Sequence, residues 1–104
     1  MKRIFILLFI ICPFLSFSQL WNQVSNFIGD GRHHPITFSN DNYGFVISGS
    51  NLTDAYRYDK SNDSWTQLQD IPFSGRGYAY GVAVGDKAYM GFGSNSNGAY
   101  PTDW

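Results

Sequence analysis

Two stretches, WNQVSNFIGDGR at residues 21–32 and WTQLQDIPFSGR at residues 65–76, decide how this chain of 104 residues is organised. Each opens on Trp, carries Gln two positions later and ends on Gly-Arg, and the second begins 44 positions after the first. The same offset relates the Gly-Ser-Asn triplet at 49–51 to the one at 93–95. A fixed period of this length, with one supersecondary unit per period, predicts a repeat architecture.

Each repeat unit is predicted to be a set of short antiparallel strands. Aromatic and β-branched residues fill short runs, and Gly, Asn, Asp and Ser fill the gaps between the runs. Residues 40–42 and 85–86 are hairpin-turn residues, and no stretch beyond the first 18 residues has the apolar spacing of a helix. The expected strands are residues 33–38, 43–48, 54–58 and 64–68 in the first unit, and 77–84 and 87–92 in the second. The predicted fold class is therefore all-β, with one four-stranded antiparallel sheet per period, as in a β-propeller blade.

The order of these residues resembles the Kelch repeat. In that family a glycine pair ends the second strand of a blade, Tyr-Asp closes the third strand, and a Trp follows in the fourth. Gly49, Tyr58-Asp59 and Trp65 stand in this order here, although Ser48 replaces the first glycine of the pair. The matching positions over both units are Trp21, Arg32, Gly49, Tyr58, Asp59, Trp65, Arg76, Gly93 and Trp104. The resemblance implies a Kelch-type β-propeller in which these residues are structural.

The resemblance also implies that the ring is incomplete within these residues. We expect the last strand of one blade around Trp21, then a complete blade and about half of another, with repeats at about 21–64 and 65–104. One blade alone buries too little surface to be stable. Residues 19–104 are therefore interpreted as the N-terminal part of a propeller domain whose remaining blades follow residue 104.

The paired Trp and Arg positions have expected physical roles. Trp21 and Trp65 are expected to pack as apolar plates between adjacent sheets. Arg32 and Arg76 begin the innermost strands, where an Arg can bond loop carbonyl groups or a nearby Asp.

The first 18 residues have the layout of a secretory signal peptide. Lys2 and Arg3 precede an uncharged, apolar run of fourteen residues, and small residues at 16 and 18 predict cleavage after Ser18. A helix of that length spans about 21 Å, which is short of a hydrocarbon core of about 30 Å. We therefore expect a bacterial protein exported to the periplasm, the cell surface or the medium, with no membrane span after cleavage.

The composition of residues 19–104 excludes several kinds of partner and site. Five basic residues against eight Asp give a net charge of −3, which disfavours a nucleic-acid partner. Cys12 is the single cysteine and lies in the signal peptide, so no disulfide, thiolate metal site or Cys nucleophile is expected. His33 and His34 are adjacent, and adjacent strand residues point to opposite faces, so they are not expected to share a metal ion. No metal and no cofactor is predicted.

Two loops are the candidate ligand-binding elements. Residues 50–53 and 94–102 join the second and third strands of their units, and such loops gather on one face of a propeller. Within them, Asn51, Asn97 and Tyr100 suit contact with a sugar or a peptide. Because no catalytic constellation is arranged in these residues, the prediction is a non-catalytic exported module that binds a protein or glycan ligand.

Kelch-like propellers also include enzymes that act on sugars, and this alternative stays open. A resemblance to the galactose oxidases implies copper beside a Tyr-Cys radical site, but residues 19–104 contain no Cys. A resemblance to the sialic-acid mutarotases implies acid–base and Arg side chains around a central channel. The local candidates for those roles are His33, Arg32 and Arg76.

Overall fold

The computed structural model describes residues 21–95 and 97–101, and this part of the chain is all-β, as predicted. Its strands are β1 (Ile36–Ser39), β2 (Tyr43–Ile47), β3 (Ala55–Asp59), β4 (Ser64–Gln67), β5 (Tyr80–Val84) and β6 (Lys87–Gly91). Each strand lies within the range expected from the sequence or within one residue of it. The predicted signal peptide and Trp104 lie outside the described residues. Within the described ranges there is no helix long and apolar enough to cross a membrane.

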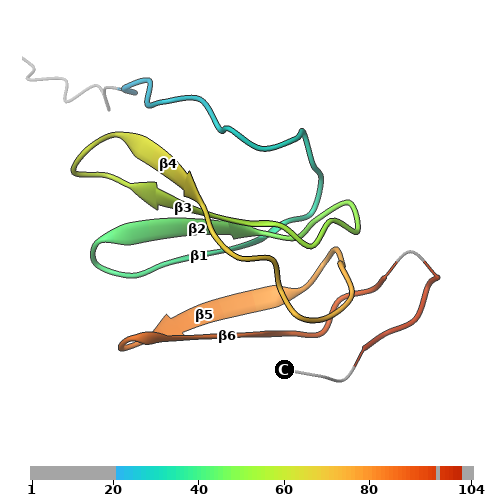
Figure 1. Ribbon diagram of the computed structural model, residues 1–104. Coiled ribbons are helices and arrows are strands. Elements are labelled where there is room, and N and C mark those ends of the chain that lie inside the picture. The colour runs from blue at the N-terminus through green and yellow to red at the C-terminus, as the bar shows by residue number, and fades with distance from the viewer. Residues whose placement is uncertain (1–20, 96, 102–104) are drawn as a thin grey trace, which may run out of the picture.

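The strands form one four-stranded antiparallel sheet, in the order β1-β2-β3-β4, and one two-stranded hairpin, β5-β6 (Figure 1). The turn between β1 and β2 forms because the Asn40 side chain accepts hydrogen bonds from the backbone N–H groups of Asn42 and Tyr43, at 3.0 and 2.8 Å. The turn after β3 is closed in the same way, since Asp59 accepts from the N–H of Ser61 at 2.8 Å. These are the side-chain turns for which Asn and Asp are favoured. The arrangement is consistent with incomplete propeller blades.

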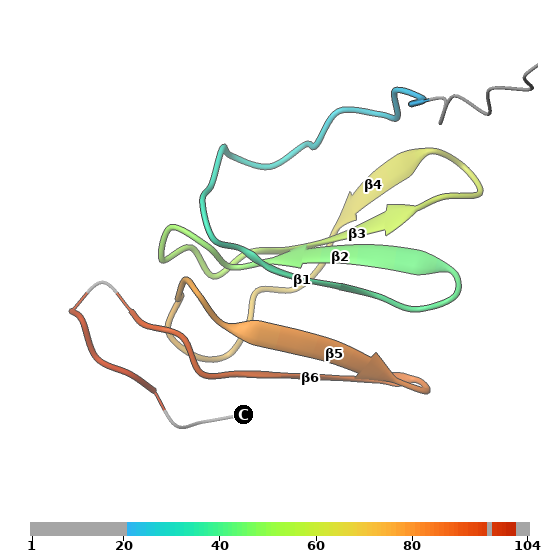
Figure 2. The same cartoon turned by 180° about the vertical axis from the view of Figure 1, so that it is seen from behind.

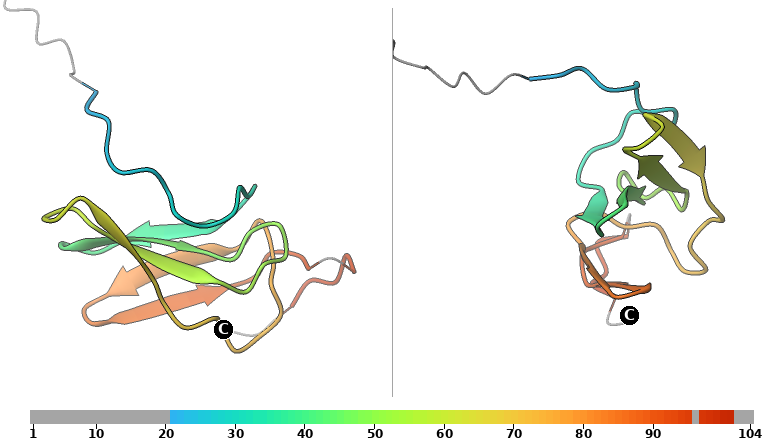
Figure 3. Two further views of the ribbon diagram at one scale, coloured as in Figure 1. Left: turned by 45° about the horizontal axis from the view of Figure 1, so that its top comes forward. Right: turned by 90° about the vertical axis from the view of Figure 1, so that its left-hand side faces the viewer.

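The core lies between the two sheets. Ile36, Ile47 and Ala55 are its buried centre. The β5–β6 hairpin lies against the β1–β2 side of the larger sheet, as Figures 1 and 2 show from opposite sides and Figure 3 shows in two further views. Gly81 permits the close approach, because a Cβ atom there would lie 2.6 Å from side-chain atoms of both Ile36 and Phe38. The first strand of the second unit, β5, therefore packs directly on the first strand of the first unit, β1.

The period of 44 residues is also visible in the backbone. His34 and Tyr78 both have a positive φ, of 52° and 58°. The same is true of Ser48 and Phe92, at 56° and 64°, where the Kelch-like pattern lacks its first glycine. A left-handed conformation costs a residue with a Cβ about 1–2 kcal/mol. Both units therefore keep the backbone that glycine favours without keeping the glycine.

Trp21 corrects one expectation from the sequence. Its side chain is 92% exposed, and residues 21–35 contain no strand, so neither the expected plate nor the expected last strand of a preceding blade is present. The reason is that no sheet among the described residues lies beside Trp21. Trp65 does pack, but on the N-terminal segment: its ring meets Phe27 edge-on at 5.0 Å, and its Nε1 donates to the Ser25 carbonyl at 3.1 Å.

Candidate functional site

Loops from the two units gather at one end of the molecule, which we call the loop end. It comprises the β2–β3 connection at residues 48–54, the chain entering β1 at 32–35, and the corresponding segments at 76–79, 92–95 and 97–101. Figure 1 shows these segments at the end opposite the β1–β2 and β5–β6 hairpin turns. Backbone hydrogen bonds join them: the N–H of Ser50 donates to the His33 carbonyl at 3.1 Å, and Gly77 and Ser94 exchange two bonds of 2.9 Å.

Arg32 clamps the loop end of the first unit. Its Nη1 donates to the Ser48 carbonyl at 3.1 Å, and its Nε donates to the Asp30 carbonyl at 3.1 Å. Its two terminal nitrogens also meet the two carboxylate oxygens of Asp54, at 2.6 and 2.8 Å. The Arg32 side chain is only 3% exposed. Its guanidinium therefore ties the β2–β3 connection to the start of β1 and is not presented to solvent.

The surroundings of this ion pair shift the acidities of its members. Hydrogen bonds from Arg32 hold the pKa of Asp54 below its usual value, and the hydrogen bond to Asp54 raises the pKa of Arg32. Tyr56 donates its hydroxyl to Asp54 at 3.0 Å, and burial together with that bond raises the pKa of Tyr56. The rings of Phe27 and Tyr56 lie 5.1 and 5.3 Å from the guanidinium carbon. The charged pair is thus enclosed by aromatic faces, which favour a cation.

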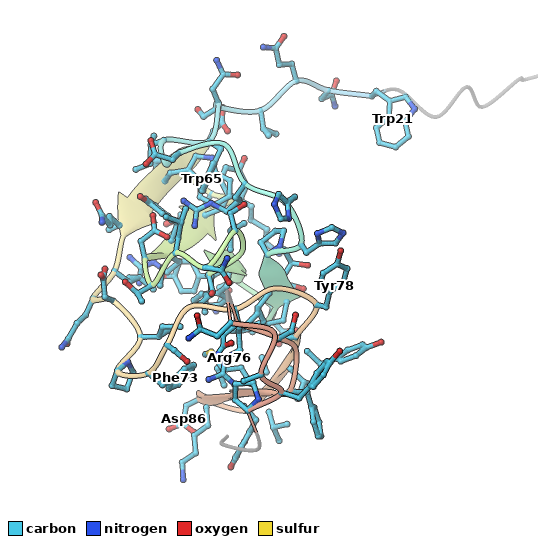
Figure 4. The ribbon with its side chains drawn as sticks, turned by 90° about the vertical axis from the view of Figure 1, so that its right-hand side faces the viewer. Trp21, Trp65, Phe73, Arg76, Tyr78 and Asp86 are labelled. Carbon is cyan, nitrogen blue, oxygen red and sulfur yellow. The ribbon has the colours of Figure 1, made fainter. Side chains whose placement is uncertain are left out.

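Arg76 occupies the corresponding place in the second unit and is fully buried. Its Nη1 lies 3.3 Å from the Phe92 carbonyl and its Nε 3.3 Å from the Ser74 carbonyl, which are the counterparts of the contacts of Arg32. The guanidinium also stacks over the Phe73 ring at 4.6 Å. Figure 4 shows Arg76 within the body of the molecule. Of the three local candidates for a mutarotase-like site, Arg32 and Arg76 therefore have buried side chains that are hydrogen-bonded to the protein. His33 is exposed.

Ser48 connects the two units beneath the loop end. Its Oγ accepts from the N–H of Arg76 at 2.8 Å and lies 2.7 Å from the Leu52 carbonyl and 2.9 Å from the Arg76 carbonyl. The N–H of Gly49 donates to the same Arg76 carbonyl at 2.9 Å. The Ser48 hydroxyl therefore bonds both to Leu52 in its own unit and to the backbone of Arg76 in the next unit. A glycine at this position could make neither bond.

Two hollows open on the loop end, of about 250 and 390 Å³. The smaller is lined by His33, Ser50, Asn51, Gly77, Tyr78, Ser94 and Asn95. The larger is lined by Tyr78, Gly93, Ser94 and Tyr100. Of the loop residues expected to face a ligand, Asn51 and Tyr100 line a hollow, whereas Asn97 lines neither and donates its backbone N–H to Asn95 at 3.0 Å. Among the described residues, the linings offer hydroxyl, amide, imidazole and aromatic groups and contain no carboxylate.

His33 and His34 do not point to opposite sides, and the expectation that they would is wrong. Their Nδ1 atoms lie 2.8 Å apart, and their rings are nearly perpendicular, at 77°. Alternation fails because both residues precede β1 and His34 has a left-handed backbone. The Tyr78 ring stacks on His34 with centroids 3.8 Å apart. In the part of the chain that the structure describes, no group of three or more His, Cys, Asp or Glu side chains gathers as a metal site.

The remaining Kelch-like residues lie away from the loop end, on the β3–β4 turn. Tyr58 donates its hydroxyl to Asp63 at 2.7 Å, and this bond raises the pKa of Tyr58. Hydrogen bonds from Ser61 lower the pKa of Asp59, and the backbone N–H of Ser25 lowers that of Asp63. These contacts close a turn and hold the N-terminal segment against it.

Sequence reasoning missed the participation of Ser48, His34 and Tyr78. The available signal was the period itself: His34 and Tyr78 are related by 44 positions, as are Ser48 and Phe92. Of these two pairs, His34 and Tyr78 meet at the loop end, where their rings stack.

No family model matches the chain. Two curated proteins named N-acetylneuraminate epimerase, from the Haemophilus influenzae strains PittEE and 86-028NP, are each 30% identical to it over 87 residues. Each match covers 75% of this chain and 23% of the relative, so the chain spans about a quarter of the length of these relatives. Over three quarters of its length, the chain is therefore similar to a part of two N-acetylneuraminate epimerases.

Proposed function

We propose that these residues are blades of an exported, Kelch-type β-propeller that acts on N-acetylneuraminate or a related acidic sugar, interconverting the two configurations at its anomeric carbon. Export is supported by the signal-like pattern of the first 18 residues. The observation that carries the proposal is the similarity to two N-acetylneuraminate epimerases, which covers 75% of this chain.

The loop end has the chemistry that such a ligand requires. A sugar offers hydroxyl groups for fixed polar partners and an apolar ring face for an aromatic side chain. Ser50, Asn51 and Asn95 line the smaller hollow, and the exposed Tyr78 forms the boundary that it shares with the larger one. An acidic sugar also carries a carboxylate, and none of the described lining residues would repel it by like charge.

Interconversion at the anomeric carbon requires a proton to leave one oxygen and reach another on the same carbon. General acid–base catalysis by a positioned side chain supplies about 10²- to 10⁴-fold for such transfers. Arg32 and Arg76 are buried and hydrogen-bonded, so they position the loops. His33 is exposed and lines a hollow, which leaves it as the local acid–base group.

The test uses the full-length protein that contains these residues. A sialidase releases the α-anomer of N-acetylneuraminate in an NMR tube, and the decay of its H3 resonances is followed with and without the protein. We expect faster conversion with N-acetylneuraminate and no acceleration for the neutral sugar glucose. A decay rate equal to that in buffer, at protein concentrations that saturate the sugar, contradicts the epimerase proposal.

A non-catalytic glycan-binding propeller is the second candidate. The observation that favours it is the exposure of Tyr78 and Tyr100 beside polar hollows, together with the enclosure of both arginines in structural clamps. The same experiment separates the two candidates. Saturation-transfer signals from the sugar without any change in its rate of conversion would select binding over catalysis.

A further inference from the structure

The contact between His33 and His34 restricts their protonation. At 2.8 Å, the two Nδ1 atoms share a hydrogen bond, so one of them carries the proton and the other accepts it. In a neutral pair the two rings are therefore opposite tautomers. The ring whose Nδ1 donates has an unprotonated Nε2, which is a base, and the ring whose Nδ1 accepts carries its proton on Nε2.

Several contacts from both repeat units hold the pair. The backbone N–H of His33 donates to Ser50 Oγ at 3.0 Å, and its carbonyl accepts from the N–H of Ser50 at 3.1 Å. The ring of His34 is stacked on Tyr78 with an interplanar angle of 26°. Both His34 and Tyr78 adopt left-handed backbones. Strained backbones are concentrated at functional sites, where the surrounding structure enforces them.

We propose that His33 is the acid–base group for the anomer interconversion and that His34 is its positioning residue, an inference that rests on the proposed function. His33 lines the hollow of about 250 Å³. His34 accepts the hydrogen bond from Nδ1–H of His33, which leaves the lone pair of His33 on Nε2. The same acceptor stabilises the imidazolium that forms when His33 takes up a proton.

One imidazole, that of His33, both takes up and returns the proton. His33 Nε2 takes the proton of the anomeric hydroxyl, a carbonyl forms at that carbon, and the bond from the carbon to the ring oxygen breaks. The electron pair of that bond passes to the ring oxygen, which receives the proton from His33 Nε2. Rotation about the adjacent carbon–carbon bond and the reverse steps on the other carbonyl face give the other anomer. No further reactant is consumed.

The decisive variants separate the hydrogen bond from the backbone strain. His34→Asn keeps an acceptor near the position of Nδ1, and Asn tolerates a positive φ. His34→Gly also accepts this φ but has no acceptor. His33→Gln removes the base. Asp86→Asn, in the hairpin turn at the opposite end of the molecule, is the matched control.

We expect kcat for anomer interconversion to fall about 100-fold in His33→Gln, within the usual range for loss of a general base. His34→Gly should lower kcat about 10-fold with little change in KM, because His33 keeps its contacts but loses its fixed tautomer. His34→Asn should retain activity within about threefold of the parent protein. These magnitudes are order-of-magnitude expectations for acid–base groups.

Three results would overturn the inference. The first is a pair of His34 variants with equal kcat, because the acceptor would then be irrelevant. The second is a His33→Gln protein as active as its parent, because His33 would then not be the base, while the epimerase proposal would stay intact. The third is read from the resting protein by ¹⁵N NMR of the imidazoles. Opposite tautomers are expected there, and two identical tautomers would rule out the pair even if the protein has no epimerase activity.

Discussion

Arg32 and Asp54 form a two-pronged ion pair that joins the start of β1 to the start of β3. The distances are 2.6 Å from Nη1 to Oδ1 and 2.8 Å from Nη2 to Oδ2. The carboxylate is 18% exposed, so the pair is mostly withdrawn from water. We expect Asp54→Asn to destabilise the full-length protein by about 2–3 kcal/mol, because it leaves a buried guanidinium without its counter-charge.

The urea midpoint and slope of Asp54→Asn measure this loss. Asp86→Asn, at an exposed turn, serves as the control and should change stability by less than about 0.5 kcal/mol. Equal midpoints for the two variants would mean that the ion pair does not hold the β2–β3 connection.

The same pair makes stability depend on pH. The pKa of Asp54 is lowered in the folded protein relative to an unfolded value of about 3.9. Its contribution is therefore fully present above about pH 4 and is lost as pH falls through the folded pKa. Asp59 and Asp63 have the same sign, but they lie on an exposed turn and contribute less. Urea midpoints measured between pH 2 and 7 should fall at the acid end, less steeply in Asp54→Asn; parallel curves would contradict the assignment.

Ser48 combines a strained backbone with a hydroxyl that joins two units. Ser48→Ala keeps the strain and loses the hydrogen bonds, so we expect a loss of about 1–3 kcal/mol. Ser48→Gly loses the same bonds but relieves a left-handed conformation, so it should be about 1 kcal/mol more stable than the Ala variant. Thermal or urea denaturation of the two variants supplies the difference. An Ala variant as stable as the Gly variant would show that the φ of 56° carries no cost.

The two repeat-related tryptophans should respond differently to truncation. Trp65 contacts Phe27 and Tyr58 and donates a hydrogen bond to Ser25. Trp65→Ala is therefore expected to cost about 3 kcal/mol, at the low end for a large aromatic because the ring is only half-buried. Trp21→Ala should cost less than about 0.5 kcal/mol, since its side chain has almost no contacts. A large loss at Trp21 would show that the full-length protein covers this residue.

The β5–β6 hairpin presents an apolar face that has no cover among the described residues. Tyr80 and Val82 are exposed there, although their counterparts one period earlier, Ile36 and Phe38, lie beneath β5. We expect residues 19–104, produced alone, to self-associate through this face rather than remain a stable monomer. Sedimentation velocity should show that Val82→Asp reduces association, whereas Thr66→Asp on the exposed side of β4 does not. Monomeric behaviour with a cooperative thermal transition would contradict this.

The strands could be located from sequence because their turns carry Asn, Asp and Gly at the positions that hairpins require. The arginine contacts with loop carbonyls follow from the same periodicity, since residues 16 positions apart face each other across the first strand pair: Arg32 meets Ser48, and Arg76 meets Phe92. The solvent exposure of Trp21 could not be predicted from the periodicity. The repeat of Trp at 21 and 65 gives the spacing of the units, but it does not indicate whether a neighbouring sheet is present to cover the side chain.

The histidine pair was missed for a different reason. Alternation of side chains holds only where the backbone is extended, and the left-handed φ of His34 has no local signal in the residue types around it. The stacked position of Tyr78 depends on how two units are set against each other. Both features arise from tertiary packing.

In the four-stranded sheet, β2, β3 and β4 each pair with the strand that precedes them in the chain, and β5 then packs on β1. The meander therefore needs only short loops to close, and each new strand meets a partner that already exists. A polypeptide that emerges from the ribosome with its N-terminal side first can build this structure one strand at a time, in the order of synthesis. Uncovered apolar side chains then lie at both ends of this order, on the N-terminal segment at Trp21 and on the last hairpin at Tyr80 and Val82, so later parts of the chain can cover both.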